Sequence, residues 1–263
     1  MKENKLIIIG NWKMNLNVSE ASLLVHRLHQ KIKVHRGVDV VLAPSMLALQ
    51  PISLEIDRRQ FKLAAQDAYY KDNGAFTGEV SCTMIRDLVN YVIIGHSERR
   101  IYFHETPELV RDKVTAAIRN EISPIICIGE TKLERQSKET NMVIHDQLTS
   151  ALANITSEDI EDVIIAYEPV WAISTFDGEI AKPKDIANVI KYIRQQVEHL
   201  YGAQIAKKVR VIYGGSVDDQ TIGSYLEIDG CDGALVGGAS LNYYKFSEII
   251  DKASKIALKN SEK

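Results

Sequence analysis

The stretch 163–213, VIIAYEPVWAISTFDGEIAKPKDIANVIKYIRQQVEHLYGAQIAKKVRVIY, carries the pattern that decides the fold. It begins and ends with short β-branched runs, Val163–Tyr167 and Val209–Tyr213, which are almost continuously apolar. Such runs are typical of parallel strands that are buried on both faces. Between them, one face at a 3.6-residue period carries Ile186, Val189, Ile190, Ile193, Val197 and Leu200. Because Pro183 suits a first helical turn, the stretch predicts a strand, a helix over 183–200 and a second strand.

The same alternation of apolar runs and helical segments extends along the whole chain. We count eight runs that predict strands: Lys5–Ile9, Val38–Ala43, Phe61–Gln66, Tyr91–Gly95, Ser123–Ile128, Val163–Tyr167, Val209–Tyr213 and Gly233–Val236. Helix signals lie between them. Thr106-Pro107-Glu108 combines an N-cap, a proline at the first helical position and a negative charge near the positive end of the helix dipole. Thr131 and Glu134 have the spacing of a capping box.

No Gly/Ser linker and no low-complexity segment divides this series of units. Eight strand–helix pairs in one uninterrupted series favour a closed (β/α)8 barrel, because closure leaves no strand edge exposed. We therefore predict an α/β fold with one barrel domain over residues 1–263. Periodicity alone leaves an open, doubly wound sheet as the alternative.

The composition narrows the function classes. Of the 263 residues, 45% are hydrophobic and 25% charged, as in an ordinary globular protein with a sizeable core. The net charge is −3 and no long run of lysine or arginine occurs, so neither nucleic acid nor a membrane is expected as a partner. Any attraction for an anionic substrate must therefore be local.

Cysteine usage and the N-terminus bear on the compartment. The three cysteines (Cys82, Cys127 and Cys231) are scattered and include no C-x-x-C pair, which fits a reducing compartment and makes a disulfide framework or a structural zinc site unexpected. Met1–Lys5 is polar and leads into an apolar stretch too short for a signal peptide. Nothing approaches the ~18 apolar residues of a membrane span. We expect a cytoplasmic protein.

Polar residues with chemical potential follow several of the predicted strands. Barrel enzymes place their chemistry at the C-terminal ends of the strands. Those ends carry Asn11 and Lys13, His96 and Glu98, Glu168, and the glycine-rich turns Gly214-Gly215-Ser216 and Gly237-Gly238. A carboxylate base, an imidazole, a cation and two backbone-rich turns on one face suit proton abstraction beside the carbonyl of a phosphorylated substrate.

The segments that carry these residues resemble the triosephosphate isomerase family from end to end and in the family's order. They are Gly10-Asn-Trp-Lys-Met-Asn15, Gly74-Ala-Phe-Thr-Gly-Glu79, Ile94-Gly-His-Ser-Glu-Arg-Arg100, Cys127-Ile-Gly-Glu130, Ala166-Tyr-Glu-Pro-Val-Trp-Ala-Ile173, Tyr213-Gly-Gly-Ser-Val217 and Val236-Gly-Gly-Ala-Ser-Leu241. The resemblance implies a single (β/α)8 TIM barrel. It also implies an isomerase of glycolysis and gluconeogenesis that interconverts dihydroxyacetone phosphate and glyceraldehyde 3-phosphate through an enediolate. No cluster of His, Cys and carboxylate residues has ligand spacing, and no G-x-G-x-x-G opens a helix after a strand, so neither a metal nor an organic cofactor is expected.

The resemblance also assigns catalytic roles, which are those of the family's known mechanism. Glu168 is the base, and a neutral His96, with its ring accepting from a helix N-terminus, hydrogen-bonds the enediolate oxygens. Lys13 supplies positive charge to the oxyanion and the phosphate, and Asn11 helps to place the substrate oxygen. Glu98 orients Lys13 or His96, with an ion pair to an arginine as the alternative. Taken alone, Glu168 reads as a solvated loop carboxylate and His96 as a structural histidine; the surrounding motifs favour the catalytic roles.

Substrate-binding and assembly roles follow from the same resemblance. Ser174 and the backbone N–H groups of Ser216, Gly237 and Gly238 bind the substrate, since glycines let the backbone approach an anion closely. Plain turns are the alternative for the glycine pairs. Segment 67–80, with Thr77, resembles the family's protruding loop that inserts into a partner subunit, so a homodimer is expected.

The chain departs from the family pattern at the lid that follows Glu168. Residues 172–182 place Ser174 and Phe176 where glycines are expected, and the segment before Pro183 is longer than usual. Two smaller departures are Cys82 in place of a helix-starting proline and His104 in place of a glycine. A four-carbon ketose phosphate, such as an erythrulose phosphate, is therefore the alternative substrate. The other possibilities are a lid that merely varies by lineage and a catalytically silent phosphate-binding paralogue.

Overall fold

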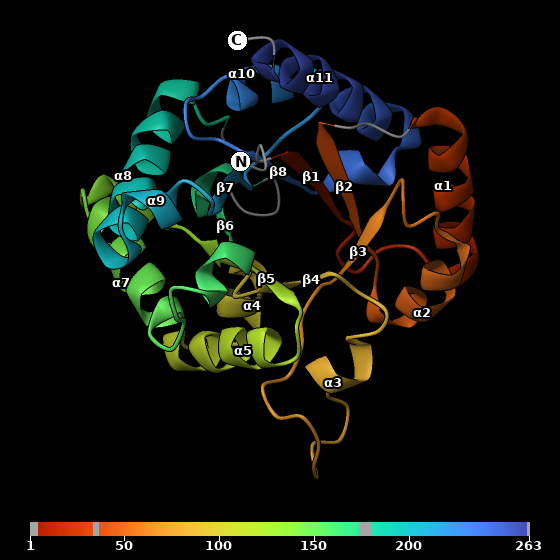
Figure 1. Ribbon diagram of the computed structural model, residues 1–263, viewed down its shortest axis with the longest axis horizontal. Coiled ribbons are helices and arrows are strands. Elements are labelled where there is room, and N and C mark those ends of the chain that lie inside the picture. The colour runs from red at the N-terminus through yellow and green to blue at the C-terminus, as the bar shows by residue number, and fades with distance from the viewer. Residues whose placement is uncertain (1–4, 34–36, 174–179, 262–263) are drawn as a thin grey trace.

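The computed structural model describes residues 5–33, 37–173 and 180–261, and these form a closed parallel barrel (Figure 1). Neighbouring strands pair in the order β1-β2-β3-β4-β5-β6-β7-β8, and β1 also pairs with β8. The strands are β1 (Leu6–Asn11), β2 (Val38–Ala43), β3 (Lys62–Ala65), β4 (Tyr91–Ile94), β5 (Ser123–Ile128), β6 (Ile164–Tyr167), β7 (Arg210–Tyr213) and β8 (Gly233–Val236). The predicted barrel is confirmed and the doubly wound alternative is wrong; the domain extent of 1–263 stays a prediction.

Helices surround the barrel in the view down its axis (Figure 1). The α-helices are α1 (Val18–Lys31), α2 (Met46–Glu55), α3 (Cys82–Ile85), α4 (Ser97–Tyr102), α5 (Pro107–Arg119), α6 (Lys132–Gln136), α7 (Thr140–Leu152), α8 (Pro183–Tyr201), α9 (Ala203–Ala206), α10 (Ile222–Leu226) and α11 (Tyr243–Ser261). Short 3₁₀ turns add η1 (Asp159–Asp162), η2 (Val170–Ala172) and η3 (Gly238–Leu241). In the described residues, no helix is long and apolar enough to cross a membrane.

The residues that the sequence predicts to start helices do so in the structure. Thr106 caps α5 by accepting from the N–H of Leu109, and Thr131 and Glu134 form the reciprocal capping box of α6. Helix α8 begins at Pro183 and buries five of the six residues assigned to its inner face. Leu200 is the exception, because it lies in the last turn and remains exposed.

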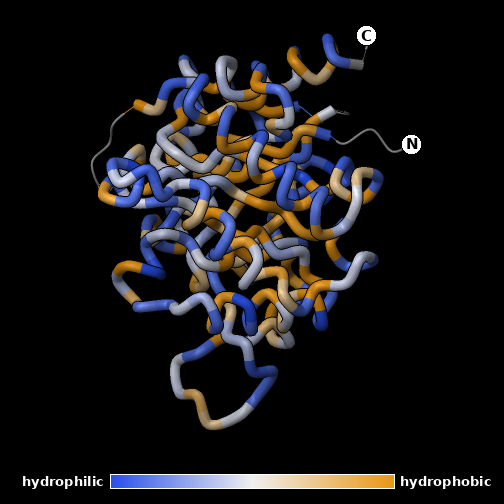
Figure 2. Tube along the Cα trace, turned by 90° about the vertical axis from the view of Figure 1, so that its left-hand side faces the viewer, coloured by the Kyte–Doolittle hydropathy of each residue, from blue (hydrophilic) through white to orange (hydrophobic). Residues whose placement is uncertain are grey.

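The strands bury side chains on both faces, which explains their continuous apolar sequence. Alternate residues of β1, Ile7 and Ile9, point into the barrel, where they pack with Val41, Ile93 and Ile125. Residues between them, such as Ile8, pack against the surrounding helices. The apolar parts of the trace accordingly concentrate inside the molecule (Figure 2).

One loop stands away from this body. Segment 67–80 links β3 to α3 and projects beyond the helices in both views (Figures 1 and 2). At its base Tyr69 N–H donates to Val80 O, and the ring of Tyr69 contacts the ring of Phe76 at 4.8 Å between centroids. The loop is therefore ordered by its own contacts while Phe76 stays 39% exposed.

The structure accounts differently for the two smaller departures from the family pattern. His104 has φ 54°, a left-handed conformation that favours glycine, which is the residue expected there from the resemblance. Cys82 is the first residue of α3, and the hydroxyl of Ser81 caps that helix by accepting from Met84 N–H. A proline is therefore not needed to start this helix.

Candidate active site

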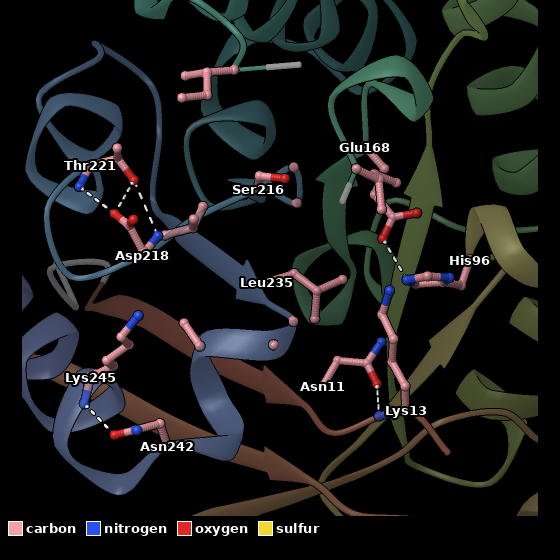
Figure 3. Close-up of a pocket in the computed structure, with 18 residues that line it drawn as sticks. Asn11, Lys13, His96, Glu168, Ser216, Asp218, Thr221, Leu235, Asn242 and Lys245 are labelled. Carbon is pink, nitrogen blue, oxygen red and sulfur yellow. Dashed lines mark hydrogen bonds and ion pairs between the residues drawn. The ribbon is translucent and has the colours of Figure 1, made fainter. Parts of the chain in front are cut away.

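A pocket of about 350 Å³ opens at the C-terminal mouth of the barrel and brings most of the predicted residues together (Figure 3). Its lining includes Asn11, Lys13, His96, Glu168, Ser216, Gly237 and Gly238. Glu98 lies just behind, in contact with Lys13. Ser174 and Phe176 lie outside the described residues. Figure 3 shows Glu168 and His96 facing each other, with Lys13 and Asn11 beside them.

Lys13 reaches the pocket through an unusual backbone conformation. Strand β1 extends to Asn11, two residues beyond its predicted end, and Lys13 follows with φ 54°. The Oδ1 atom of Asn11 accepts from the Lys13 N–H at 3.0 Å, which stabilises this left-handed turn. The strand has therefore ended before Lys13, and this left-handed turn, not the alternation of a strand, sets the direction of the Lys13 side chain.

Glu98 is placed beside the ammonium group of Lys13. Its Oε1 accepts from Lys13 Nζ at 2.7 Å, and its Oε2 lies 3.7 Å from Nδ1 of His96. Glu98 thus contacts Lys13 more closely than it contacts His96. This contact holds the ammonium in a fixed position at the pocket wall.

His96 caps helix α4 with its ring. The Nδ1 atom accepts from the backbone N–H of Glu98 at 3.2 Å. An accepting Nδ1 carries no proton, which leaves the N–H of the ring on Nε2. That atom faces the pocket and lies 3.2 Å from Oε1 of Glu168.

Glu168 follows β6 and is 1% exposed. Its Oε2 accepts from the backbone N–H of Ser97 at 3.1 Å, whereas Oε1 has no aligned donor in the part of the chain that the structure describes. The backbone around it is tightly packed: a Cβ at Gly129 would lie 1.8 Å from the carbonyl oxygen of Glu168. The site therefore holds a buried carboxylate with one oxygen fixed and the other available as an acceptor.

A buried hydrogen-bond network fixes the residues on either side of Glu168. Glu130 is fully buried and accepts from the Tyr167 hydroxyl at 3.1 Å and from Trp171 Nε1 at 3.0 Å. Burial and the neighbouring Glu130 carboxylate raise the pKa of Tyr167 well above its ordinary value, so Tyr167 stays a donor. The guanidinium of Arg135 lies over the Trp171 ring at 4.2 Å.

Cys127 lies in β5 beside Glu168 but has no free thiolate. Full burial and the adjacent Glu168 carboxylate raise the pKa of this thiol well above its ordinary value. A neutral thiol is a poor nucleophile and a poor base. Cys127 therefore serves as a small buried residue of the barrel core.

The other end of the pocket is built from backbone. Turn η3 begins after Gly237, and Gly237, Gly238 and Ala239 line the pocket there. The first N–H groups of a helical turn have no partner inside the turn, so they suit an anion. Ser216 differs from the expectation, because its N–H and its hydroxyl both donate to Ala172 O, at 3.0 and 2.8 Å. Its N–H must leave Ala172 before it can bind a phosphate.

Comparisons with known proteins agree with this geometry. A family model described as triosephosphate isomerase matches residues 6–253. A protein named triosephosphate isomerase from Carboxydothermus hydrogenoformans is 44% identical over 247 residues, which cover 94% of this chain and 98% of that protein. Relatives of the same name from Clostridium beijerinckii and Thermoanaerobacter sp. (strain X514) are 42% and 44% identical, covering 94% and 93% of this chain and 99% and 98% of theirs. The chain belongs to the triosephosphate isomerase family.

The pocket also contains polar residues that the sequence analysis does not single out. Asp218 and Thr221 line it from the turn after β7, and Lys245 lines it from the first turn of α11. A signal for Lys245 exists, because Asn242 precedes a helical pattern as an N-cap residue would. The sequence does not show, however, that this first turn of α11 faces the pocket.

The described residues of the pocket differ from the donor sets that hold metal ions. Among the described residues, no group of three or more His, Cys, Asp or Glu side chains is placed to hold one. The polar groups at the pocket instead contact one another in a row, in which Glu98 lies between Lys13 and His96, and His96 lies beside Glu168.

Proposed function

We propose that this chain interconverts dihydroxyacetone phosphate and glyceraldehyde 3-phosphate through an enediolate intermediate. The observation that carries the proposal is the pairing of a buried carboxylate with an imidazole whose protonated nitrogen faces it at 3.2 Å. Glycine-rich turns line the other end of the same pocket, and their backbone N–H groups suit a phosphate. Family membership over 94% of the chain supports the same reaction.

Glu168 acts as the base in this proposal. Its Oε1 accepts the proton from the carbon beside the carbonyl and returns it to the neighbouring carbon. A positioned base of this kind contributes about 10²–10⁴-fold to the rate. The carboxylate must first move from His96 Nε2, because the ring and the carboxylate cannot both keep this contact while substrate lies between them.

His96 and Lys13 stabilise the charge that develops on the substrate oxygens. The Nε2–H of neutral His96 donates to them, and Lys13 places its ammonium beside the oxyanion. Asn11 positions the same oxygen, and Glu98 orients Lys13 through their 2.7 Å contact. The backbone N–H groups of Ser216, Gly237 and Gly238 bind the phosphate, with Ser174 from the segment outside the described residues.

One kinetic comparison tests the proposal. Steady-state kcat/KM is measured on three-carbon and four-carbon ketose phosphates, each with and without a chelator. We expect strong preference for dihydroxyacetone phosphate and no effect of the chelator. One extra hydroxymethyl group in a closed pocket should cost about 10–200-fold.

Other outcomes of this comparison would replace the proposal. Preference for the four-carbon substrate would assign the altered segment 172–182 to substrate selection. Absence of turnover on either substrate would assign a phosphate-binding role without catalysis. Loss of activity with the chelator and its return with a divalent ion would contradict the metal-free mechanism.

The metabolic setting and the compartment belong to the same proposal. We infer a role in glycolysis and gluconeogenesis, because both pathways interconvert these two triose phosphates. We also infer a cytoplasmic location, since the three cysteines are free and buried. Fractionation of cells that express the native chain, with immunodetection of the protein, tests the location.

We further propose a homodimer formed through loop 67–80 with Thr77. The loop stands out from the barrel with Phe76 partly exposed, and Met14 beside Lys13 is 97% exposed. Exposed apolar side chains on both a projection and a neighbouring surface favour burial in a partner subunit. Association through this loop would also affect the active site, because Gln66 at the base of the loop donates to Lys13 O at 2.9 Å.

We expect Thr77→Arg to yield a monomer with strongly reduced activity at micromolar concentration, because a buried unpaired charge opposes association. Sedimentation velocity and kcat/KM are the measurements. Leu133→Asp, which changes an exposed apolar residue on α6, serves as the control and should leave a dimer. A fully active monomer of the unmodified chain would contradict the proposal.

A further inference from the structure

The charges around the pocket leave its phosphate end in need of a cation. Of the charged groups in the described lining, Lys13 and Lys245 are cations, and Glu168 and Asp218 are anions. Lys13 Nζ is only 2.7 Å from the carboxylate of Glu98, which offsets much of its charge. A sugar phosphate is close to a dianion at neutral pH, and the whole chain has a net charge of −3. A further positive charge at this site would therefore strengthen binding.

Lys245 lies on the side of the pocket opposite Glu168 and His96. Figure 3 shows it beyond Ser216 and Leu235, next to Asn242, with its side chain extended along the pocket wall. Asn242 Oδ1 accepts from the N–H groups of Tyr244 and Lys245, at 3.0 and 3.1 Å, and so fixes the first turn of α11. Gly237 and Gly238 line the same pocket.

This position is unfavourable for a lysine unless an anion is nearby. The N-terminus of a helix is its positive end, so a cation in the first turn opposes the helix dipole. Helix α11 runs over 19 residues, and Lys245 lies in its first turn. The dipole and the lysine therefore add positive potential at the same end of the pocket.

Among the described residues, Asp218 is an anion close enough to Lys245 for the lysine's charge to act on it. Burial alone would raise its pKa, but hydrogen bonds from Thr221 and Gln220 and the charge of Lys245 hold the pKa below its ordinary value. Its Oδ1 already accepts from Gln220 N, Thr221 N and Thr221 Oγ1 at 2.9–3.0 Å. Asp218 is thus well satisfied by its own turn, and the ammonium of Lys245 is not needed to complete its hydrogen bonds.

We propose that Lys245 is a substrate-binding residue that contacts the phosphate as the second cation of the site. Lys13 then acts at the carbonyl end, where charge develops during the reaction, and Lys245 acts at the end where charge is constant. A group that binds substrate and transition state equally affects KM more than kcat. This inference rests on the proposed function for its substrate, but inorganic phosphate alone tests it.

The experiment compares Lys245→Met with Lys255→Met, an exposed lysine on the same helix that does not line the pocket. We expect Lys245→Met to raise KM for dihydroxyacetone phosphate about 3- to 20-fold with little change in kcat, as for one partly exposed cation acting on a dianion. The calorimetric Kd for inorganic phosphate should rise by a similar factor. Lys245→Arg should retain most of the binding, and Lys255→Met should match the unmodified chain.

A double-mutant cycle with Asp218→Asn separates direct binding from neutralisation of Asp218. If Lys245 contacts phosphate, Lys245→Met weakens phosphate binding in the Asp218→Asn background as well. If the effect disappears in that background, Lys245 only screens Asp218 and the proposal is overturned. Equal effects of Lys245→Met and Lys255→Met, or no effect on phosphate binding, also overturn it. Because inorganic phosphate carries no sugar, these results stand even if the proposed isomerase reaction fails.

Discussion

Glu168→Asp is expected to lower kcat by about 10²–10⁴-fold while KM changes little. The substitution keeps the carboxylate and removes one methylene, so it withdraws the base from the substrate carbon. A displacement of about 1 Å in a reacting group can cost on the order of 10²-fold, because proton transfer requires close approach. The surrounding structure cannot correct the loss, since Gly129 packs directly against the Glu168 backbone and the buried Glu130 network fixes Tyr167 and Trp171.

Two measurements make this test specific. Uptake of solvent deuterium at the substrate carbon should fall in parallel with kcat, because the same base removes that proton. Glu198→Asp, the same change at an exposed position of α8, should leave both quantities unchanged. A raised KM with unchanged kcat in Glu168→Asp would exclude Glu168 as the base.

The barrel was predictable because its determinants are local and repeated. Each strand is buried on both faces, so each of the eight runs shows the same apolar signature. Helix starts were equally readable, since Thr106, Pro183 and Thr131 act through neighbours within one turn. Errors arose at element ends: β1 extends to Asn11, and Leu200 lies where α8 leaves the core.

The site was predictable where a residue's position depends on the end of its own strand. His96 and Glu168 follow β4 and β6 closely, so the sequence order brings them to the same mouth. Prediction failed where the direction of a side chain or of an N–H group depends on backbone conformation or on contacts with residues distant in the sequence. The left-handed turn at Lys13 and the engagement of Ser216 with Ala172 leave no signal in composition or period.

The place of Lys245 in the pocket also could not be predicted from the sequence. Its position in the first turn of α11 could be inferred from the N-cap at Asn242. Its presence in the pocket depends on how the closing of the barrel places α11 beside η3 and the turn after β7. That placement is a property of the tertiary structure, and the spacing of apolar residues along α11 does not predict it.

Lys13→Met should lower kcat by about 10²–10³-fold, the usual cost of removing one preorganised group that stabilises an oxyanion. The ammonium of Lys13 is held at the pocket wall by Glu98 at 2.7 Å, so it need not reorganise when charge develops on the substrate. KM should also rise, because the substitution leaves the Glu98 carboxylate without its cation beside a dianionic substrate. Steady-state kcat and KM for dihydroxyacetone phosphate are the measurements.

The double variant Lys13→Met/Glu98→Gln separates these two effects. Neutralising Glu98 removes the repulsion, so KM should recover toward the unmodified value. The loss in kcat should persist, because no cation then faces the developing oxyanion. Glu98→Gln alone should change kcat by much less than Lys13→Met, since the ammonium remains. Recovery of kcat in the double variant would mean that Lys13 serves only to neutralise Glu98, and the electrostatic role assigned to Lys13 would be wrong.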